Sequence, residues 1–223
     1  MTKTIIDRPI YRMVNYIYAF FVTNLYFMLL ISPFMMVFYL AEFTVQNILL
    51  FYLALIPFGP GFAALLKTMD KLVNEKIIEP TKDFWRFFGQ NFKLAWKYWF
   101  VQWTIIVILI IDIHYANLYM PMLAPIFLMF IAVCLVLMCY TFPILTKFEV
   151  KLKNLFVIST YAIFKYLKTT LLNLSTIVAF GIIFYAYPGI AVLFLMSLIG
   201  FFMMYNMQTV FKQLEQEFSK NDN

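Results

Sequence analysis

The chain alternates between long apolar stretches and short segments that are rich in charge. Residues 13–66 contain one charged side chain, Glu42, residues 98–146 contain one, Asp112, and residues 169–211 contain none. Each window is about twice the ~20 residues that a helix needs to cross a bilayer. The pattern predicts three helical hairpins with six transmembrane helices, at about residues 14–40, 45–66, 98–112, 123–145, 169–186 and 190–211.

Composition identifies lipid as the solvent of these helices. The chain is 64% hydrophobic and 13% charged, whereas soluble domains are about 45–50% apolar and about 25% charged. Aromatic residues make up 21% of the chain, and amphipathic aromatic rings collect at the two membrane boundaries. We therefore expect an all-α integral membrane protein whose first partner is the lipid bilayer.

The basic residues predict the orientation. All 17 Lys and Arg residues lie in four segments, residues 1–12, 67–97, 147–168 and 212–220. Positive segments of membrane proteins face the cytoplasm, so a multi-pass protein of the plasma membrane with both termini cytoplasmic is expected. The net charge of +6 then faces anionic lipid headgroups, and nucleic acid is excluded as a partner.

The second expected span contains a break. Pro57, Gly59, Pro60 and Gly61 fall within five residues and cannot continue a regular helix. An opened backbone in lipid survives where it is buried in protein or lines a cavity. These four residues are the candidate hinge or ligand-contacting turn, and a purely structural bend is the alternative.

The charged interval after the break predicts two further helical segments. Residues 67–79 are expected to extend the second span, Pro80 to end that extension, and Thr81 to cap the next helix. Aromatic side chains then recur at three- and four-residue steps, which predicts an amphipathic helix in the inner membrane interface. This helix is either a membrane anchor or a docking surface for another subunit, and its candidate residues are Phe84, Trp85, Phe88, Phe92, Trp96 and Trp99.

Candidate chemistry is sparse. Asn15 and Asn24 lie near one face of the first span, where hydrogen bonding between helices is the expected role and a polar lining is the alternative. Asp112 and His114 supply only two of the three or four ligands of a zinc site, and we interpret them as an exposed pair in the loop at the tip of the second hairpin. Motifs for phosphate binding, zinc proteolysis and serine hydrolysis are absent. We therefore predict no catalytic residues, no metal and no cofactor, and we do not expect an enzyme.

Two runs carry a family resemblance. The run IPFGPGFAALLKTMDKLVNEK, followed by DFWRFFGQNFKLAWKYW, resembles the YesL family, small polytopic membrane proteins of Gram-positive bacteria. The resemblance covers about residues 15–115 and includes Phe84, Phe87, Phe88, Asn91, Phe92 and Ala95. Family members often carry Thr-Ile-Gly-Pro-Ala where this chain has residues 57–61, which puts any role of that Thr in doubt.

The resemblance also implies a function. YesL-like proteins are commonly encoded beside carbohydrate ABC importers and glycoside hydrolases, which implies a non-catalytic accessory or regulatory subunit that contacts the permease subunits of such an importer. The alternative is an independent transporter of a small solute or lipid. That alternative predicts a polar cavity beside the break, lined by Asn24, Gln102, Asn173 or Ser175.

Overall fold

The computed structural model describes residues 9–221, and side chains within residues 12–217. This part of the chain is all-α, without strands. Its helices are α1 (Pro9–Leu40), η2 (Val45–Asn47), α2 (Ile48–Ala54), α3 (Phe58–Glu75), α4 (Pro80–Tyr119), η3 (Pro121–Leu123), α5 (Ala124–Lys147), α6 (Leu152–Lys165), α7 (Leu167–Ala186), α8 (Pro188–Ala191) and α9 (Leu195–Asn221).

Several of these helices are suited to cross a membrane. Four are long and apolar enough by themselves, namely Arg12–Leu40, Pro80–Tyr119, Pro121–Lys147 and Leu167–Ala186. Helices α2 and α3 qualify together as a fifth span that bends by 44° at the break between them. The described chain therefore has the character of a multi-pass membrane protein with four or five spans. The helix expected at residues 190–211 is not among them.

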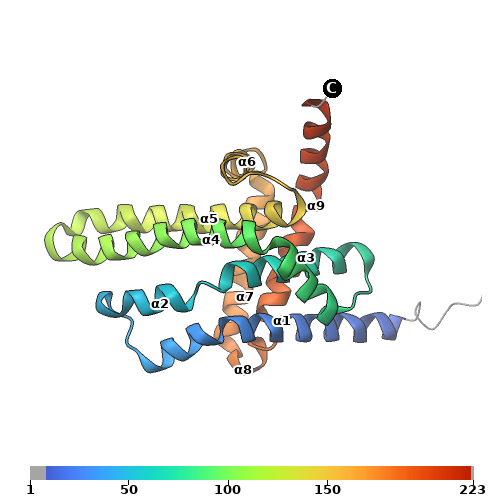
Figure 1. Ribbon diagram of the computed structural model, residues 1–223, viewed down its shortest axis with the longest axis horizontal. Helices are drawn as coiled ribbons and strands as arrows, with labels where there is room; N and C mark the ends of the chain where they lie inside the picture. The colour runs from blue at the N-terminus through green and yellow to red at the C-terminus, as the bar shows by residue number, and fades with distance from the viewer. Residues whose placement is uncertain (1–8, 222–223) are drawn as a thin grey trace, which may run out of the picture.

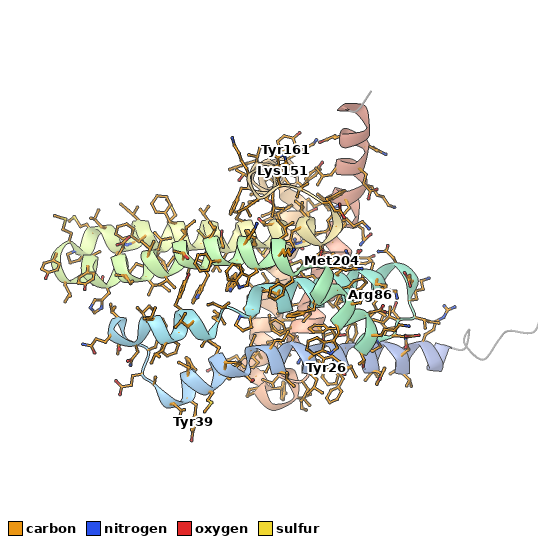
Figure 2. All side chains as sticks on the ribbon, in the orientation of Figure 1. Tyr26, Tyr39, Arg86, Lys151, Tyr161 and Met204 are labelled. Carbon is orange, nitrogen blue, oxygen red and sulfur yellow. The ribbon has the colours of Figure 1, made fainter. Side chains whose placement is uncertain are left out.

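The third expected hairpin does not lie alongside the first two. In Figure 1 the α4–α5 hairpin extends to one side, roughly along the direction of α1, while α7 and α9 run across that direction. Helix α3 occupies the centre and packs against α1, α4, α5 and α9. In Figure 2, Met204 of α9 lies inside this central region, whereas Tyr39 at the end of α1 points away from it.

Helix α4 corrects two expectations. The expected amphipathic helix and the third span form one unbroken helix of 40 residues, which is about 60 Å long and twice the ~30 Å thickness of the hydrocarbon layer. Pro80 begins this helix, and Glu79 occupies the N-cap position that we expected for Thr81. Proline fits the first helical turn because the amide hydrogen it lacks has no helical partner there. The hydroxyl of Thr81 accepts a hydrogen bond from Tyr26 instead.

Candidate functional site

The second span is broken between α2 and α3, at residues 55–57, slightly before the place that the sequence predicted. Of the four candidate residues, Pro57 caps α3, whereas Gly59, Pro60 and Gly61 lie in its first turn. The expectation that they cannot continue a helix was wrong, because a proline in the first turn lacks only an amide hydrogen that has no helical partner there.

Two indole groups of α4 donate hydrogen bonds to carbonyls at the end of α2 and in the break, where the Leu55 carbonyl also accepts from the Phe58 amide at 3.2 Å. Trp99 Nε1 donates to the Leu55 carbonyl at 2.8 Å, and Trp103 Nε1 donates to the Tyr52 carbonyl at 3.2 Å. The two indole rings stack at 5.6 Å. Side chains of a neighbouring helix thus provide the hydrogen bonds that a broken helix in lipid requires.

The two glycines in the first turn of α3, just after the break, allow close packing. A Cβ atom on Gly59 would lie 2.3 Å from Trp99 Cβ, and a Cβ atom on Gly61 would lie 3.0 Å from Leu30 Cδ1. Gly59, Pro60 and Gly61 are buried, and Pro57 is half-buried. Close packing of this kind holds the bend in one position. It therefore favours the interpretation of these residues as a fixed structural bend over a hinge or a ligand-contacting turn.

A second break lies between α8 and α9, at residues 192–194. Buried Asn24 of α1 bridges it, because its Nδ2 donates to the Val192 carbonyl at 2.8 Å and its Oδ1 accepts from the Met196 amide at 3.1 Å. The Ser197 amide lies 3.4 Å from the same oxygen. The expected role of Asn24 in bonding between helices is confirmed. The break itself was not predicted, since residues 192–194 contain neither Pro nor Gly.

Replacing Asn24 with leucine is expected to lower the free energy of unfolding by about 1–2 kcal/mol, because backbone groups at the second break lose their partner. Unfolding in mixed micelles, followed by tryptophan fluorescence, measures the change. Asn15→Leu is the control, since Asn15 makes a single exposed bond, to the Lys76 carbonyl. Equal losses in the two variants would contradict the bridging role.

An apolar cavity of about 420 Å³ lies between the two breaks. Leu55 and Phe58 line it from the first break, and Val192, Leu195 and Met196 line it from the second. The other residues around it are also apolar or aromatic: Phe27, Met28, Ile31, Phe34, Met35, Trp99, Trp103, Ile106, Leu135, Met138 and Phe184. Such walls fit a hydrocarbon chain and offer no hydrogen bonds to a sugar or an ion.

The four polar residues expected to line a cavity beside the first break do not line this one. The other three also form hydrogen bonds within the protein. Gln102 donates to the Cys134 carbonyl at 3.0 Å, Ser175 donates to the Leu172 carbonyl at 2.9 Å, and Asn173 Oδ1 accepts from Asn206 at 3.1 Å. Gln102 and Asn173 are buried, at 1% and 0% exposure. The polar groups of the helices thus hold the structure together at these positions.

The six candidate aromatic residues of α4 fall into two groups. Phe84 and Trp99 are buried in the core, and Phe88 packs against it. Trp85, Phe92 and Trp96 remain 41%, 41% and 38% exposed. The outward group is available to a membrane surface or a partner, whereas the inward group is committed to the fold.

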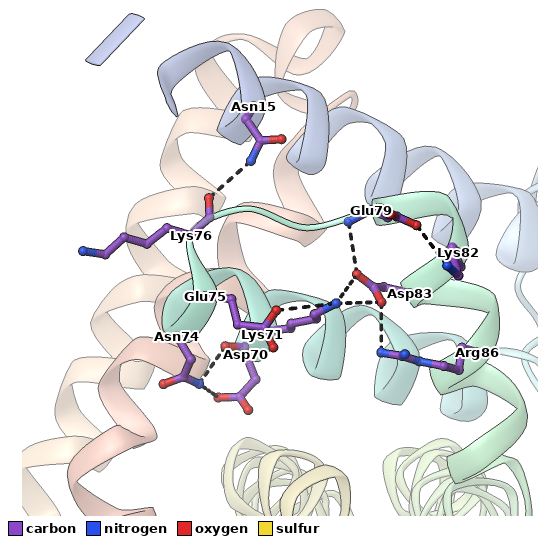
Figure 3. A network of polar contacts seen from close by, with 10 residues as sticks. All are labelled: Asn15, Asp70, Lys71, Asn74, Glu75, Lys76, Glu79, Lys82, Asp83 and Arg86. Carbon is purple, nitrogen blue, oxygen red and sulfur yellow. Dashed lines mark hydrogen bonds and ion pairs between the residues drawn. The ribbon is translucent and has the colours of Figure 1, made fainter. Parts of the chain in front are cut away.

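Buried Asp83 holds together the segments that follow the first break (Figure 3). Its carboxylate accepts two hydrogen bonds from Lys71 Nζ of α3, at 2.8 and 2.9 Å, and one from Arg86 at 2.9 Å. It also accepts from the Glu79 amide at 3.1 Å, which satisfies the start of α4. A single carboxylate therefore joins α3, the α3–α4 connection and α4.

A second carboxylate, Asp70, joins α3 to two further helices. Gln208 of α9 donates to Asp70 Oδ1 at 2.7 Å, and Lys147 of α5 lies 3.5 Å from Oδ2. Asn74 donates to the same side chain from within α3. The charged ends of α3, α5 and α9 are thus tied to one another.

Among the described residues no group of three or more His, Cys, Asp or Glu side chains is placed to hold a metal ion. Asp112 and His114 lie within α4, where the sequence analysis expected a loop. His114 lines a pocket of about 370 Å³ whose walls are mostly apolar residues of α4, α2 and the segment before α2.

Comparison with known proteins places the first half of the chain near a described family. A family model, "Protein of unknown function, DUF624", matches residues 20–113, a segment that contains the first break, Asp83 and the candidate aromatic residues of α4. No curated protein and no solved structure matches the chain. Over the matched segment the chain is therefore similar to a family of unknown function, one that includes YesL-like proteins.

Proposed function

We propose that this protein is a non-catalytic accessory or regulatory membrane subunit associated with a carbohydrate ABC importer. The proposal includes a multi-pass arrangement of up to six spans in the plasma membrane with both termini cytoplasmic. Its partner class, the permease subunits of such an importer, rests on the resemblance to the YesL family. Its general form, a docking subunit, rests on the surface of the α4–α5 hairpin.

The far part of this hairpin is apolar but has little protein around it. Figure 1 shows it extending beyond the other helices. In the most apolar stretch of Pro121–Lys147, 6% of the residues are buried within the chain. Large exposed side chains cover this part of the hairpin, among them Ile108, Leu118, Leu128, Met129, Phe130 and Val133. Such a surface requires lipid or another membrane protein as cover.

The buried polar side chains favour a docking role, because they leave no polar pathway for a sugar or an ion through the cavity between the breaks. Asn24 and Gln102 are buried and donate hydrogen bonds within the protein. Buried Asn173 accepts one from Asn206, and its own Nδ2 has no partner among the described residues. A pathway for sugars or ions needs polar groups that face a cavity, and the cavity between the breaks has none.

Lipid handling is the second candidate function. The apolar cavity of about 420 Å³ supports it, because both broken helices contribute to the walls. Discontinuous helices commonly flank the substrate site in membrane transporters. Under this second candidate function, the cavity holds the acyl chain of a lipid and not a small polar solute.

Purification of the tagged protein from its native membrane in a mild detergent tests the two candidates together. We expect permease subunits and their ATPase to remain bound through size-exclusion chromatography in a fixed ratio. Phe130→Ala, on the α4–α5 hairpin, should reduce this ratio, because aromatic anchors dominate interface energies. Phe164→Ala on α6 is the control, since Phe164 is 74% exposed and lies outside the hairpin.

The outcomes separate the candidates. Loss of the permease from the Phe130→Ala variant and its retention by the Phe164→Ala variant would support the accessory role. A monomer or homo-oligomer without a permease would overturn it. If mass spectrometry then detected a stoichiometric lipid, lipid handling would become the favoured function.

A further inference from the structure

A polar pocket of about 580 Å³ lies where α3, α4 and α5 leave their apolar stretches. We call it the inner polar pocket. Its walls are Lys67 of α3, Gln90, Asn91 and Leu94 of α4, Leu145, Thr146 and Lys147 of α5, and Phe148, Glu149 and Val150 of the α5–α6 connection. Its volume falls within the ~300–1,000 Å³ range of small-molecule sites.

The two lysines lie at equivalent positions in the sequence pattern. Lys67 is the first charged residue after the charge-free stretch 43–66, and Lys147 is the first after residues 113–146. Both therefore lie at the boundary where the basic segments meet the membrane surface. Basic pockets between membrane helices on this side are typical sites for anionic headgroups.

Of the two lysines in the wall of this pocket, Lys67 is the one that no ion pair with a described residue holds. It is half-buried, and its ammonium lies 5.4 Å from the centre of the Phe87 ring. It forms no ion pair with any described residue, whereas Lys147 is paired with Asp70 at 3.5 Å. A half-buried ammonium without an ion-pair partner attracts an anion more strongly than a solvated one, because solvent screens it less.

We propose that the inner polar pocket binds a phosphate group, carried by an anionic phospholipid or by a soluble phosphate-bearing molecule. The ammonium groups of Lys67 and Lys147 supply charge-assisted hydrogen bonds to phosphate oxygens. The Gln90 amide supplies neutral donors on the α4 side, and Asn91 supplies the second hydrogen of an amide that already donates to the Phe87 carbonyl at 3.1 Å. Glu149 is the one carboxylate in the wall, and it weakens the attraction for anions.

Because Glu149 should weaken anion binding and Lys67 should strengthen it, variants of the two residues are expected to change phosphate binding in opposite directions. The full chain is placed in nanodiscs of phosphatidylcholine with phosphatidylglycerol, and native mass spectrometry counts the phosphatidylglycerol retained after release. In a second arm, nanodiscs of phosphatidylcholine alone are dialysed against labelled inorganic phosphate. We expect Lys67→Gln to weaken binding about fivefold, the effect of one lysine near a membrane surface, and Glu149→Gln to strengthen it.

Lys97→Gln is the matched control. Lys97 also borders a charge-free window, residues 98–111, but it lies outside the pocket. Lys67 and Glu149 form no ion pair with described residues, so their single variants should keep the fold. Thermal denaturation checks this, and it also checks the double variant Lys67→Gln with Lys147→Gln, in which the contact to Asp70 is lost.

A lipid headgroup is supported as the ligand if the wild type retains one phosphatidylglycerol, the Lys67→Gln variant retains less and the Glu149→Gln variant retains more. Phosphate binding in the same order, without retained phosphatidylglycerol, supports a soluble phosphate-bearing ligand. Binding in neither arm overturns the proposal, and so does a loss in the Lys97→Gln variant as large as that in the Lys67→Gln variant. Weaker binding by the Glu149→Gln variant also overturns it.

Discussion

Asp83→Asn should lower the free energy of unfolding by about 3 kcal/mol, a large effect for one isosteric change. Removing one partner of a buried ion pair costs about 3–5 kcal/mol, because the remaining charge is left without compensation. The Asp83 side chain is 3% exposed and that of Lys71 is 22% exposed. Arg86 is 47% exposed, so water compensates part of its loss, and we expect the lower end of the range. Unfolding in mixed micelles measures the difference.

Glu75→Gln is the control for this prediction. The Glu75 carboxylate lies 3.6 Å from the same Lys71 ammonium, but its side chain is 59% exposed. Exposed ion pairs contribute about 0–1 kcal/mol, so this variant should remain close to the wild type. Similar losses in the two variants would show that the burial of Asp83 does not carry the effect.

Gly59→Ala should also destabilise the protein by about 3 kcal/mol, at the upper end of the cost of overpacking a core. The added Cβ atom would lie 2.3 Å from Trp99 Cβ and 2.6 Å from Cγ. These atoms form the base of the Trp99 side chain, which therefore cannot yield by a change of rotamer alone. Relief requires α3 and α4 to move apart, which weakens the hydrogen bond from Trp99 to the Leu55 carbonyl.

Two other glycines provide a graded comparison in the same assay. A Cβ atom on Gly200 would lie 2.4 Å from Leu65 Cδ2, the flexible end of a side chain, so Gly200→Ala should cost less than Gly59→Ala. Gly89 lies within α4 with no atom in the space that a Cβ would take, and Gly89→Ala should stabilise the helix by about 0.5–1 kcal/mol. A different order of the three variants would contradict the role of close packing at the break.

Local features of the chain predicted much of the fold. The charge-free windows located the helices of the first two hairpins, and the cluster of Pro and Gly at residues 57–61 predicted the bend between α2 and α3. The continuous helix α4 was missed, because its polar and apolar halves differ in composition although the backbone continues through both. The composition of a segment indicates whether it lies in water or in lipid. Where a helix begins and ends depends instead on capping residues and helix breakers.

The candidate site required knowledge of contacts between distant residues. Asn24 bonds the Val192 carbonyl across 168 positions, and Trp99 bonds the Leu55 carbonyl across 44. No local periodicity reports such pairs. The transporter alternative placed Asn24, Gln102 and Asn173 in the wall of a polar cavity, whereas the structure uses each of them in a hydrogen bond within the protein.

The sequence by itself determined the class of the protein, the places where charge meets lipid and the approximate position of the first break. These properties follow from the cost of burying charge in lipid and from the backbone chemistry of Pro and Gly. The tertiary structure alone decided the second break, the apolar walls between the breaks, the burial of Asp83 and the meeting of Lys67 with Lys147. They depend on which helices pack together, because a buried polar group takes its partner from whichever segment lies beside it.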